Sequence, residues 1–234
     1  MKRLICFDLD GTLTQHRTPL EDKNRAVLDR LAAKYKLLMV GAGATARIWN
    51  QMGQYPIDIL GNYGMEESKA IDGKYVLVRE DVSPVDQAFF REKIEYLREK
   101  YGYTEYKGES VEFHASGMVT FPLLGTKADI ADKLAFDPTR EKRKVLYPEV
   151  LELFGDFTVY IGGSSSFDFS AKQYNKYDAI MRYARENGYT QDEILYVGDD
   201  FGDGGGDSHV RICGMDYVEV TDYRTLDALM EQYY

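Results

Sequence analysis

Cysteine and positive charge are both scarce in this sequence. Of 234 residues only two are cysteines, Cys6 and Cys213. That number is too small for a disulfide framework, so we expect each to pack as a small apolar side chain in a reducing compartment. Lysine and arginine total 29 against 39 aspartate and glutamate residues, a formal charge of −10. The composition argues against a nucleic-acid-binding protein, which needs a basic face, and an anionic substrate must meet a local positive site.

Long apolar runs are also missing. The first run, Leu4–Phe7, stops at Asp8, whereas a signal peptide needs an apolar core of about 7–15 residues. No segment approaches the ~20 apolar residues of a membrane span. The sequence therefore predicts a soluble protein with no membrane attachment, and we expect it in the cytoplasm.

Short strands alternate with helices near both ends of the chain. Short apolar runs are typical of strands buried in a parallel sheet, and helical apolar spacing separates them. The strands are expected at 4–7, 37–40, 194–197 and 217–220, and the helices at 20–34, at 175–187 and after Asp222. This pattern predicts an α/β fold with a doubly wound parallel sheet, whose loops gather at the carboxyl ends of the strands.

The middle of the chain has a different pattern. Ser83-Pro84 is typical of a helix start, and apolar residues at helical spacing follow it. Two half-exposed strands and a charged helical stretch are expected at 111–114, 158–161 and 126–154. We interpret 81–171 as an α+β domain inserted between 1–80 and 172–234, the two halves of the parallel-sheet domain.

The strongest chemical signal follows the first strand, in Phe7-Asp8-Leu9-Asp10-Gly11-Thr12-Leu13-Thr14. Two carboxylates at the end of a buried strand are costly without a cation nearby. Asp8 and Asp10 can reach one small volume if the chain bends between them, and Gly11 permits the bend. One carboxylate can then attack phosphorus while the other manages a proton. The alternative, a capped turn with two solvated aspartates, fits this string poorly.

A second acidic segment, Gly198–Asp207, contains four aspartates separated by glycines. Carboxylates on a flexible loop at a strand end are typical of a site for a hard cation. An EF-hand calcium loop is the obvious competitor, but a loop that opens at Asp199 would need glutamate where Val210 stands. A merely solvated acidic loop is the other alternative.

The string that contains Asp8 and Asp10 resembles the nucleophile motif of the haloacid dehalogenase superfamily of phosphotransferases. The resemblance implies that Asp8 is the nucleophile and becomes phosphorylated. It implies that Asp10 is the acid/base, and that its backbone carbonyl helps to hold Mg²⁺.

The same resemblance assigns roles to the second half of the chain. It implies that Asp199 is a metal ligand, with Asp207 or Asp203 as a further ligand or a support behind it, of which Asp207 is the better match. The superfamily also places a lysine against the phosphate and the nucleophile. Lys176, at the head of a predicted helix, stands where that lysine is expected, and Lys172 is the alternative.

A narrower resemblance, to the phosphomannomutase branch, covers nearly the whole chain. It rests on Gly162-Gly163-Ser164-Ser165-Ser166-Phe167-Asp168 followed by Lys176, on Val111-Glu112-Phe113 with Gly117-Met118, and on Gly205-Gly206-Asp207 with His209. In that branch an α+β cap closes over the active site. The resemblance implies that Ser166 and Asp168 touch the sugar, although from the residues alone a hinge or a strand-end turn is an equal alternative.

The chain departs from that branch where a second, non-reacting phosphate would be held. The phosphomannomutases use arginines of the cap, and this chain has Lys107, His114 and Thr126-Lys127 at or near those positions. Lysine and histidine do not reproduce the bidentate grip of arginine on phosphate. A mutase must hold a bisphosphate intermediate, whereas a phosphatase only needs to admit water.

A second departure lies in the loop Val40-Gly41-Ala42-Gly43-Ala44-Thr45. The superfamily uses serine or threonine just after this strand to hold the transferring phosphoryl group, and Gly43 stands at that position. Backbone N–H groups of the loop or the hydroxyl of Thr45 are the candidate replacements.

Together these features predict a Mg²⁺-dependent sugar-phosphate phosphatase that works through an aspartyl-phosphate. Phosphomannomutase is the alternative, and a non-enzymatic phospho-receiver or binding protein is a remote third. The expected partner is a small phosphorylated substrate such as a hexose phosphate. Whether the chain forms a homodimer stays open.

Overall fold

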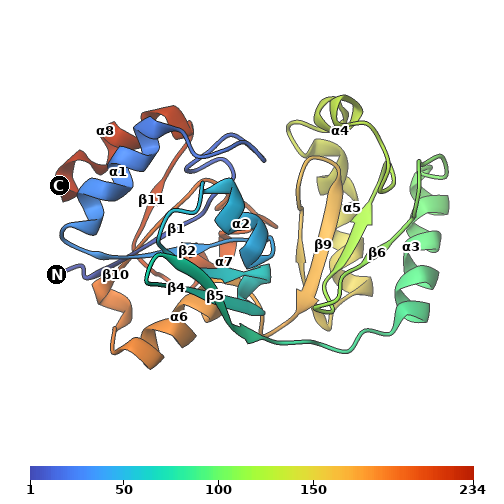
Figure 1. Ribbon diagram of the computed structural model, residues 1–234. Coiled ribbons are helices and arrows are strands. Elements are labelled where there is room, and N and C mark those ends of the chain that lie inside the picture. The colour runs from blue at the N-terminus through green and yellow to red at the C-terminus, as the bar shows by residue number, and fades with distance from the viewer. The chain divides into compact units, whose positions relative to one another are not determined.

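The computed structural model describes residues 1–234, which fold into two units (Figure 1). The core unit consists of Met1–Asp81, Tyr174–Asp203 and Asp207–Tyr234. The insert unit consists of Val82–Gln173 and Gly204–Gly206. No helix of either unit combines the length and the apolar character that crossing a bilayer requires.

The core unit is built on a seven-stranded sheet in the order β11-β10-β1-β2-β3-β4-β5. Its strands are β1 (Leu4–Phe7), β2 (Lys36–Val40), β3 (Asp58–Gly61), β4 (Glu66–Ile71), β5 (Lys74–Glu80), β10 (Ile194–Gly198) and β11 (Tyr217–Glu219). The pairs from β11 to β3 are all parallel. Every residue of β1 is buried, as a continuous apolar run at the centre of a parallel sheet requires.

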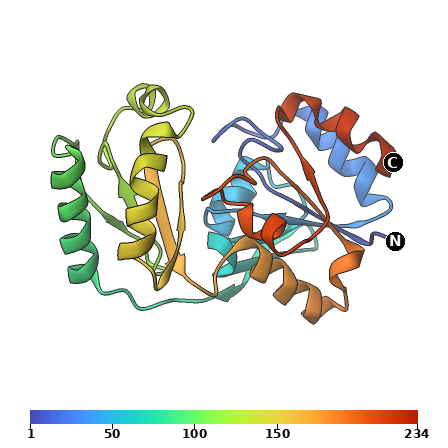
Figure 2. The ribbon, with the colours of Figure 1, turned by 180° about the vertical axis from the view of Figure 1, so that it is seen from behind.

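Helices cover both faces of this sheet (Figures 1 and 2). They are α1 (Asp22–Ala32), α2 (Thr45–Gln51), α6 (Lys176–Asn187), α7 (Ser208–Ile212) and α8 (Leu226–Met230), with 3₁₀ turns at Asn62–Gly64, Gln191–Glu193, Tyr223–Thr225 and Glu231–Tyr233. Ile5 and Phe7 of β1 pack with α1, α2 and α8, whereas Leu4 and Cys6 pack with α6 and α7. Alternate residues of one strand thus enter two cores, and the expected doubly wound α/β fold is confirmed.

The far edge of the sheet differs from the expected all-parallel arrangement. β4 pairs antiparallel with both β3 and β5. Asp72 and Gly73 connect β4 to β5 with φ angles of 52° and 72°. A two-residue turn with both φ angles positive joins antiparallel strands, because a parallel connection needs a crossover of a dozen or more residues.

The insert unit is an antiparallel sheet with helices against one face. Its sheet order is β6-β7-β9-β8. The elements are α3 (Gln87–Tyr101), β6 (Glu112–Phe113), β7 (Val119–Pro122), α4 (Ile130–Phe136), α5 (Glu141–Leu153), β8 (Phe157–Tyr160) and β9 (Ser166–Ala171). Phe90 of α3 and Val150 of α5 pack with Phe121 and Phe169 of the sheet in one apolar core. The unit is therefore α+β.

Helix α3 begins later than the sequence predicted. Ser83-Pro84 lies outside it, and Asp86 is the N-cap. The Asp86 side chain accepts hydrogen bonds from the backbone N–H groups of Ala88 and Phe89, at 3.0 and 3.1 Å. Proline at a first helical position is only a weak signal when a better capping side chain follows it.

A buried arginine holds the loop that leads into β9. The side chain of Arg143 is 1% exposed, and its Nε pairs with Asp137 at 2.9 Å. Its Nη1 donates to the carbonyl oxygens of Gly162 and Gly163, at 2.7 and 3.1 Å. The guanidinium therefore serves the fold of the insert unit.

Replacing Arg143 by leucine should lower the free energy of unfolding of the insert unit by about 3–5 kcal/mol, because Asp137 would stay buried without its ion-pair partner. Lys144→Ala is the matched control. The neighbouring Lys144 is 54% exposed and pairs only with Glu141, so its loss should change stability by less than about 1 kcal/mol. Urea unfolding followed by circular dichroism measures both. Equal stabilities of the two variants would contradict the prediction.

Candidate active site

The sheet order places three loops side by side at the carboxyl edge of the core unit. β1 lies between β10 and β2, with Phe7 in register with Val197 and with Met39. The loop after β1 begins with Asp8, the loop after β10 with Asp199, and the loop after β2 with Gly41. Residues nearly 200 positions apart in sequence therefore meet at one edge, where ligands bind in open α/β sheets.

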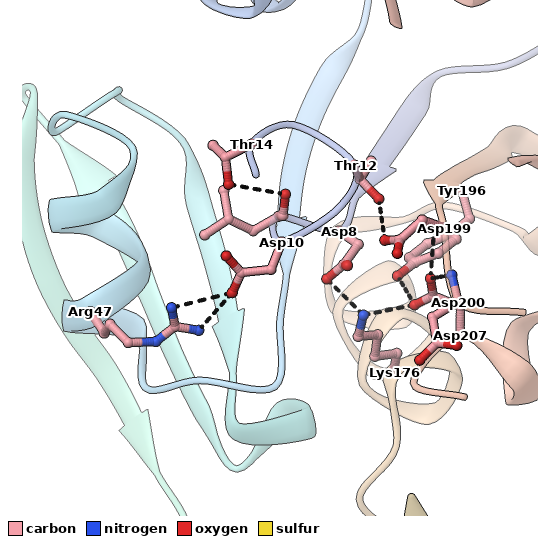
Figure 3. A network of polar contacts seen from close by, with 11 residues as sticks. Asp8, Asp10, Thr12, Thr14, Arg47, Lys176, Tyr196, Asp199, Asp200 and Asp207 are labelled. Atoms are coloured by element: carbon pink, nitrogen blue, oxygen red, sulfur yellow. Dashed lines mark hydrogen bonds and ion pairs between the residues drawn. The ribbon is translucent and has the colours of Figure 1, made fainter. Parts of the chain in front are cut away.

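Asp8 is fixed at the centre of this edge (Figure 3). Its backbone N–H donates to the carbonyl of Val197 at 2.9 Å, and its Oδ1 accepts a hydrogen bond from Nζ of Lys176 at 2.7 Å. The residue is 8% exposed, and burial raises the pKa of its carboxyl group although Lys176 opposes the shift. The second oxygen, Oδ2, keeps no hydrogen bond and is free to meet a ligand.

Lys176 bridges two carboxylates. It is the first residue of α6, after the N-cap Asn175, and its side chain is 4% exposed. Its Nζ lies 2.7 Å from Asp8 Oδ1 and 2.7 Å from Asp207 Oδ1. Lys176, and not Lys172, thus provides the buried positive charge beside Asp8.

Asp207 supports the site from behind. Its Oδ1 accepts from Lys176 and from the hydroxyl of Tyr196, and its Oδ2 accepts from the backbone N–H groups of Asp199 and Asp200. Its side chain is fully buried, and Lys176 with these donors lowers the pKa of Asp207 against the effect of burial. Both oxygens are already used, so this carboxylate holds the lysine and the loop in place.

Asp199 faces the loop that carries Asp8 and Asp10. Its Oδ1 accepts a hydrogen bond from the Thr12 hydroxyl at 2.8 Å. Gly11 has φ 99°, and a β-carbon on it would lie 2.3 Å from Asp199 Oδ2, so glycine is needed for both reasons. Burial is the main cause that raises the pKa of Asp199 to about 6.

Three carboxylates meet here with a single lysine. Oxygens of Asp8, Asp199 and Asp207 all lie within 4.8 Å of one another. Hard oxygen donors that carry more negative charge than Lys176 can offset fit a divalent cation such as Mg²⁺. The structure does not bring Asp203 to this cluster, because its side chain is 95% exposed and lies 3.4 Å from Arg211.

Asp10 turns to the other side of its loop (Figure 3). Its Oδ1 accepts from the backbone N–H of Arg17 and from Gln51 Nε2, both at 2.7 Å. Its Oδ2 accepts from Nη1 and Nη2 of Arg47 at 3.3 and 3.4 Å. These donors lower the pKa of Asp10 although burial opposes them. Arg47 and Gln51 lie one turn apart on α2, and no motif of the sequence indicated them.

The loop after β2 offers no free hydroxyl. Thr45 is fully buried, and its Oγ1 lies 2.9 Å from Glu66 Oε2 and 2.8 Å from the hydroxyl of Tyr75. Its backbone N–H also donates to Glu66, at 2.8 Å. Thr45 therefore joins the loop to the β4–β5 edge, and at Gly43 the space beside the backbone contains the guanidinium of Arg47.

In the insert unit, two of the predicted binding residues share a partner. Thr120 donates to Asp168 Oδ1 at 2.7 Å, and its Oγ1 lies 3.0 Å from His114 Nε2. Burial raises the pKa of Asp168. Thr120 was missed because only the strand register, which sets it opposite Asp168, shows the contact.

The other two predicted binding residues of this unit are separate. The Ser166 hydroxyl, at the start of β9, donates to the carbonyl of Gly162 at 3.1 Å. Lys107 pairs with Asp129 at 2.7 Å and with Asp132 at 3.5 Å, and its side chain is 59% exposed. The lysine charge is thus already shared between two carboxylates.

Comparisons with known proteins identify a family and a fold. The family model of haloacid dehalogenase-like hydrolases matches residues 5–204. A phosphomannomutase of Encephalitozoon cuniculi (strain GB-M1) is 22% identical over 247 residues, which cover 99% of this chain and 94% of the relative. An IMP-bound, N-terminally truncated IMP-nucleotidase of Plasmodium falciparum superposes with a TM-score of 0.74 at 14% identity, covering 99% of this chain and 68% of the other. The subclass IIB sugar phosphatase BT4131 superposes with a TM-score of 0.64 at 14% identity, covering 99% of both chains.

The doubly wound sheet, the acidic cluster at the carboxyl edge of its strands and the family match together define the protein as an enzyme of the hydrolase class. The chain belongs to the haloacid dehalogenase-like hydrolases, since that family model covers most of its length. The resemblance inferred from the motifs, including the likeness to phosphomannomutases, is thereby confirmed. At 14% identity the solved structures speak for the fold alone.

Proposed function

We propose that this enzyme is a Mg²⁺-dependent sugar-phosphate phosphatase that forms an aspartyl-phosphate on Asp8. The proposal rests on the contacts of the two oxygens of the Asp8 carboxylate. One oxygen is held by Lys176, the other is free, and Asp199 lies on the same edge of the sheet. A buried, oriented carboxylate beside a lysine and a cation site is equipped to attack a phosphoryl group.

The reaction has two displacements at the same phosphorus. In the first, Oδ2 of Asp8 attacks phosphorus, the bond from phosphorus to the sugar oxygen breaks, and Asp10 gives that oxygen the proton that it took from water in the preceding turnover. In the second, water attacks the phosphorus, Asp10 takes a proton from the water, and the bond to Asp8 breaks to release phosphate. Lys176 keeps Asp8 in line and offsets negative charge in both steps.

The metal belongs to the same proposal. Mg²⁺, held by the carboxylates of Asp8 and Asp199 and the backbone carbonyl of Asp10, would supply the positive charge that a phosphoryl group in transfer needs. Asp207 is assigned to positioning because its oxygens are already hydrogen-bonded, and Asp203 is left out because it is exposed.

The insert unit is proposed to be the cap that selects the sugar. Asp168 and Ser166 carry the polar groups for this task, and Thr120 with His114 fixes the orientation of Asp168. A carboxylate held in one rotamer discriminates well between hydroxyl arrangements, because a missing partner leaves it unpaired.

A mutase is the second candidate, because the relatives at 22% and 24% identity are phosphomannomutases. A mutase must grip a second phosphate. Lys107 is paired with two aspartates, His114 is hydrogen-bonded to Thr120, and Arg143 is buried in the fold of the insert unit. Hydrolysis is therefore favoured over transfer between positions.

Free phosphate release should exceed transfer between the 1- and 6-positions of mannose phosphate. Each charge-assisted hydrogen bond missing from the grip on the second phosphate is worth about 1.5–3 kcal/mol. A panel of phosphorylated sugars, assayed with and without glucose 1,6-bisphosphate, follows both products in one tube. Conversion of mannose 1-phosphate to mannose 6-phosphate well ahead of phosphate release, with a requirement for the bisphosphate, would establish the mutase instead.

A further inference from the structure

The side-chain position of Gly43 is filled by another residue. A β-carbon on Gly43 would lie 2.3 Å from Nη2, 2.4 Å from Nε and 2.7 Å from Cζ of Arg47. The φ angle of Gly43 is outside the left-handed region, so the backbone itself would accept a side chain. Glycine is needed here to make room for the guanidinium.

Arg47 is anchored on its helix but only loosely held at its tip. Its Nη1 donates to Gln51 at 2.7 Å, one turn along α2, whereas its contacts with Asp10 are long, at 3.3 and 3.4 Å. The side chain is 40% exposed. Nε and the second N–H of Nη2 have no acceptor, so the guanidinium keeps donors for a ligand.

Asp10 does not depend on this contact. Its Oδ1 already accepts from Arg17 N–H and Gln51 Nε2 at 2.7 Å each, which fixes the carboxylate without the arginine. Arg47 can therefore exchange Asp10 for a stronger anion without releasing the Asp10 side chain. The loop that carries Gly43 follows β2, directly beside the strand that ends at Asp8.

We propose that Arg47 binds the transferring phosphoryl group, and that Gly43 and Arg47 together replace the side-chain hydroxyl that the loop after β2 lacks. The inference rests on the proposed phosphatase function and names a residue for that site. The ligand is a tetrahedral phosphoryl dianion, for which a guanidinium fork offers two parallel N–H donors. Thr45, the only hydroxyl in the loop, is already bound to Glu66 and Tyr75.

A cycle of variants tests the pair Gly43–Arg47. Arg47→Ala should lower kcat/KM for para-nitrophenyl phosphate about tenfold to a hundredfold and weaken inhibition by orthovanadate similarly, since a charge-assisted contact is lost. Adding Gly43→Ser to the Arg47→Ala variant should raise kcat/KM at least about threefold above that of Arg47→Ala alone, because a hydroxyl then enters the emptied space. The same Gly43→Ser change with Arg47 present should bring no gain, since the two side chains compete for one place.

Two controls keep the outcomes separate. Arg25→Ala removes a guanidinium that stacks on Tyr55. It should leave kcat/KM and the inhibition constant of orthovanadate within about twofold of wild type. Fluorescence of Trp49, the only tryptophan, reports whether each variant keeps the core unit folded. Folded Arg47→Ala enzyme with unchanged vanadate inhibition, or a double variant no better than Arg47→Ala, overturns the inference. Neither result touches the phosphatase proposal, which the Asp8→Asn variant and the comparison of phosphate release with mutase activity test separately.

Discussion

Replacing Asp8 by asparagine should reduce phosphate release at least about 1,000-fold, because an amide cannot attack phosphorus or carry the phosphoryl group. The fold should survive the change. Asparagine has nearly the same shape, and it removes one of three crowded carboxylates while Lys176 keeps its contact with Asp207. The thermal midpoint followed by Trp49 fluorescence should therefore stay the same or rise.

Acid quenching gives a second measurement of the same prediction. Wild-type enzyme mixed with ³²P-labelled substrate should retain acid-stable label on the protein, and the Asp8→Asn variant should retain none. Asp22→Asn, an exposed carboxylate in the first turn of α1, is the control that should behave like wild type. Turnover by Asp8→Asn within about tenfold of wild type would falsify the covalent mechanism.

The centre of the site could be predicted because its signals are local. Apolar runs that stop at Asp8 and at Asp199 identify strands and their carboxyl ends, and parallel strands put those ends on one edge. The antiparallel hairpin of β4 and β5 also has a local signal, because Asp72-Gly73 is typical of a two-residue hairpin turn. This turn was not among the predictions made from the sequence.

Other features depend on contacts that no local pattern encodes. Asp203 and Asp207 lie in the same glycine-rich loop, and only the folded loop shows that one is exposed and the other buried against Lys176. Thr120 reaches Asp168 through strand register, which depends on the sheet as a whole. No local pattern of the sequence singles out Arg47, and only the structure shows its guanidinium in the space beside Gly43.

Removal of divalent metal should abolish phosphate release. The carboxylates of Asp8 and Asp199 lie at the substrate edge, and only Lys176, which also pairs with Asp207 behind them, offsets their charge. Without a cation they repel the phosphate dianion. Dialysis against EDTA should reduce activity to background, and Mg²⁺ should restore it. Ca²⁺ should inhibit, because its larger and looser coordination misplaces the phosphoryl group relative to Asp8.

Asp199 and Asp203, in the loop after β10, allow the metal requirement to be assigned to one side chain. Asp199→Asn should raise the Mg²⁺ concentration for half-maximal activity at least about tenfold, since it weakens a ligand beside Asp8. Asp203→Asn removes the same charge from the same loop, but its side chain is 95% exposed, so that concentration should stay within about twofold of wild type. Full activity in excess EDTA would exclude a metal enzyme. A larger effect at Asp203 than at Asp199 would move the ligand along the loop, because both variants lose one carboxylate charge from the same loop and a charge as exposed as that of Asp203 is largely screened unless it binds the metal directly.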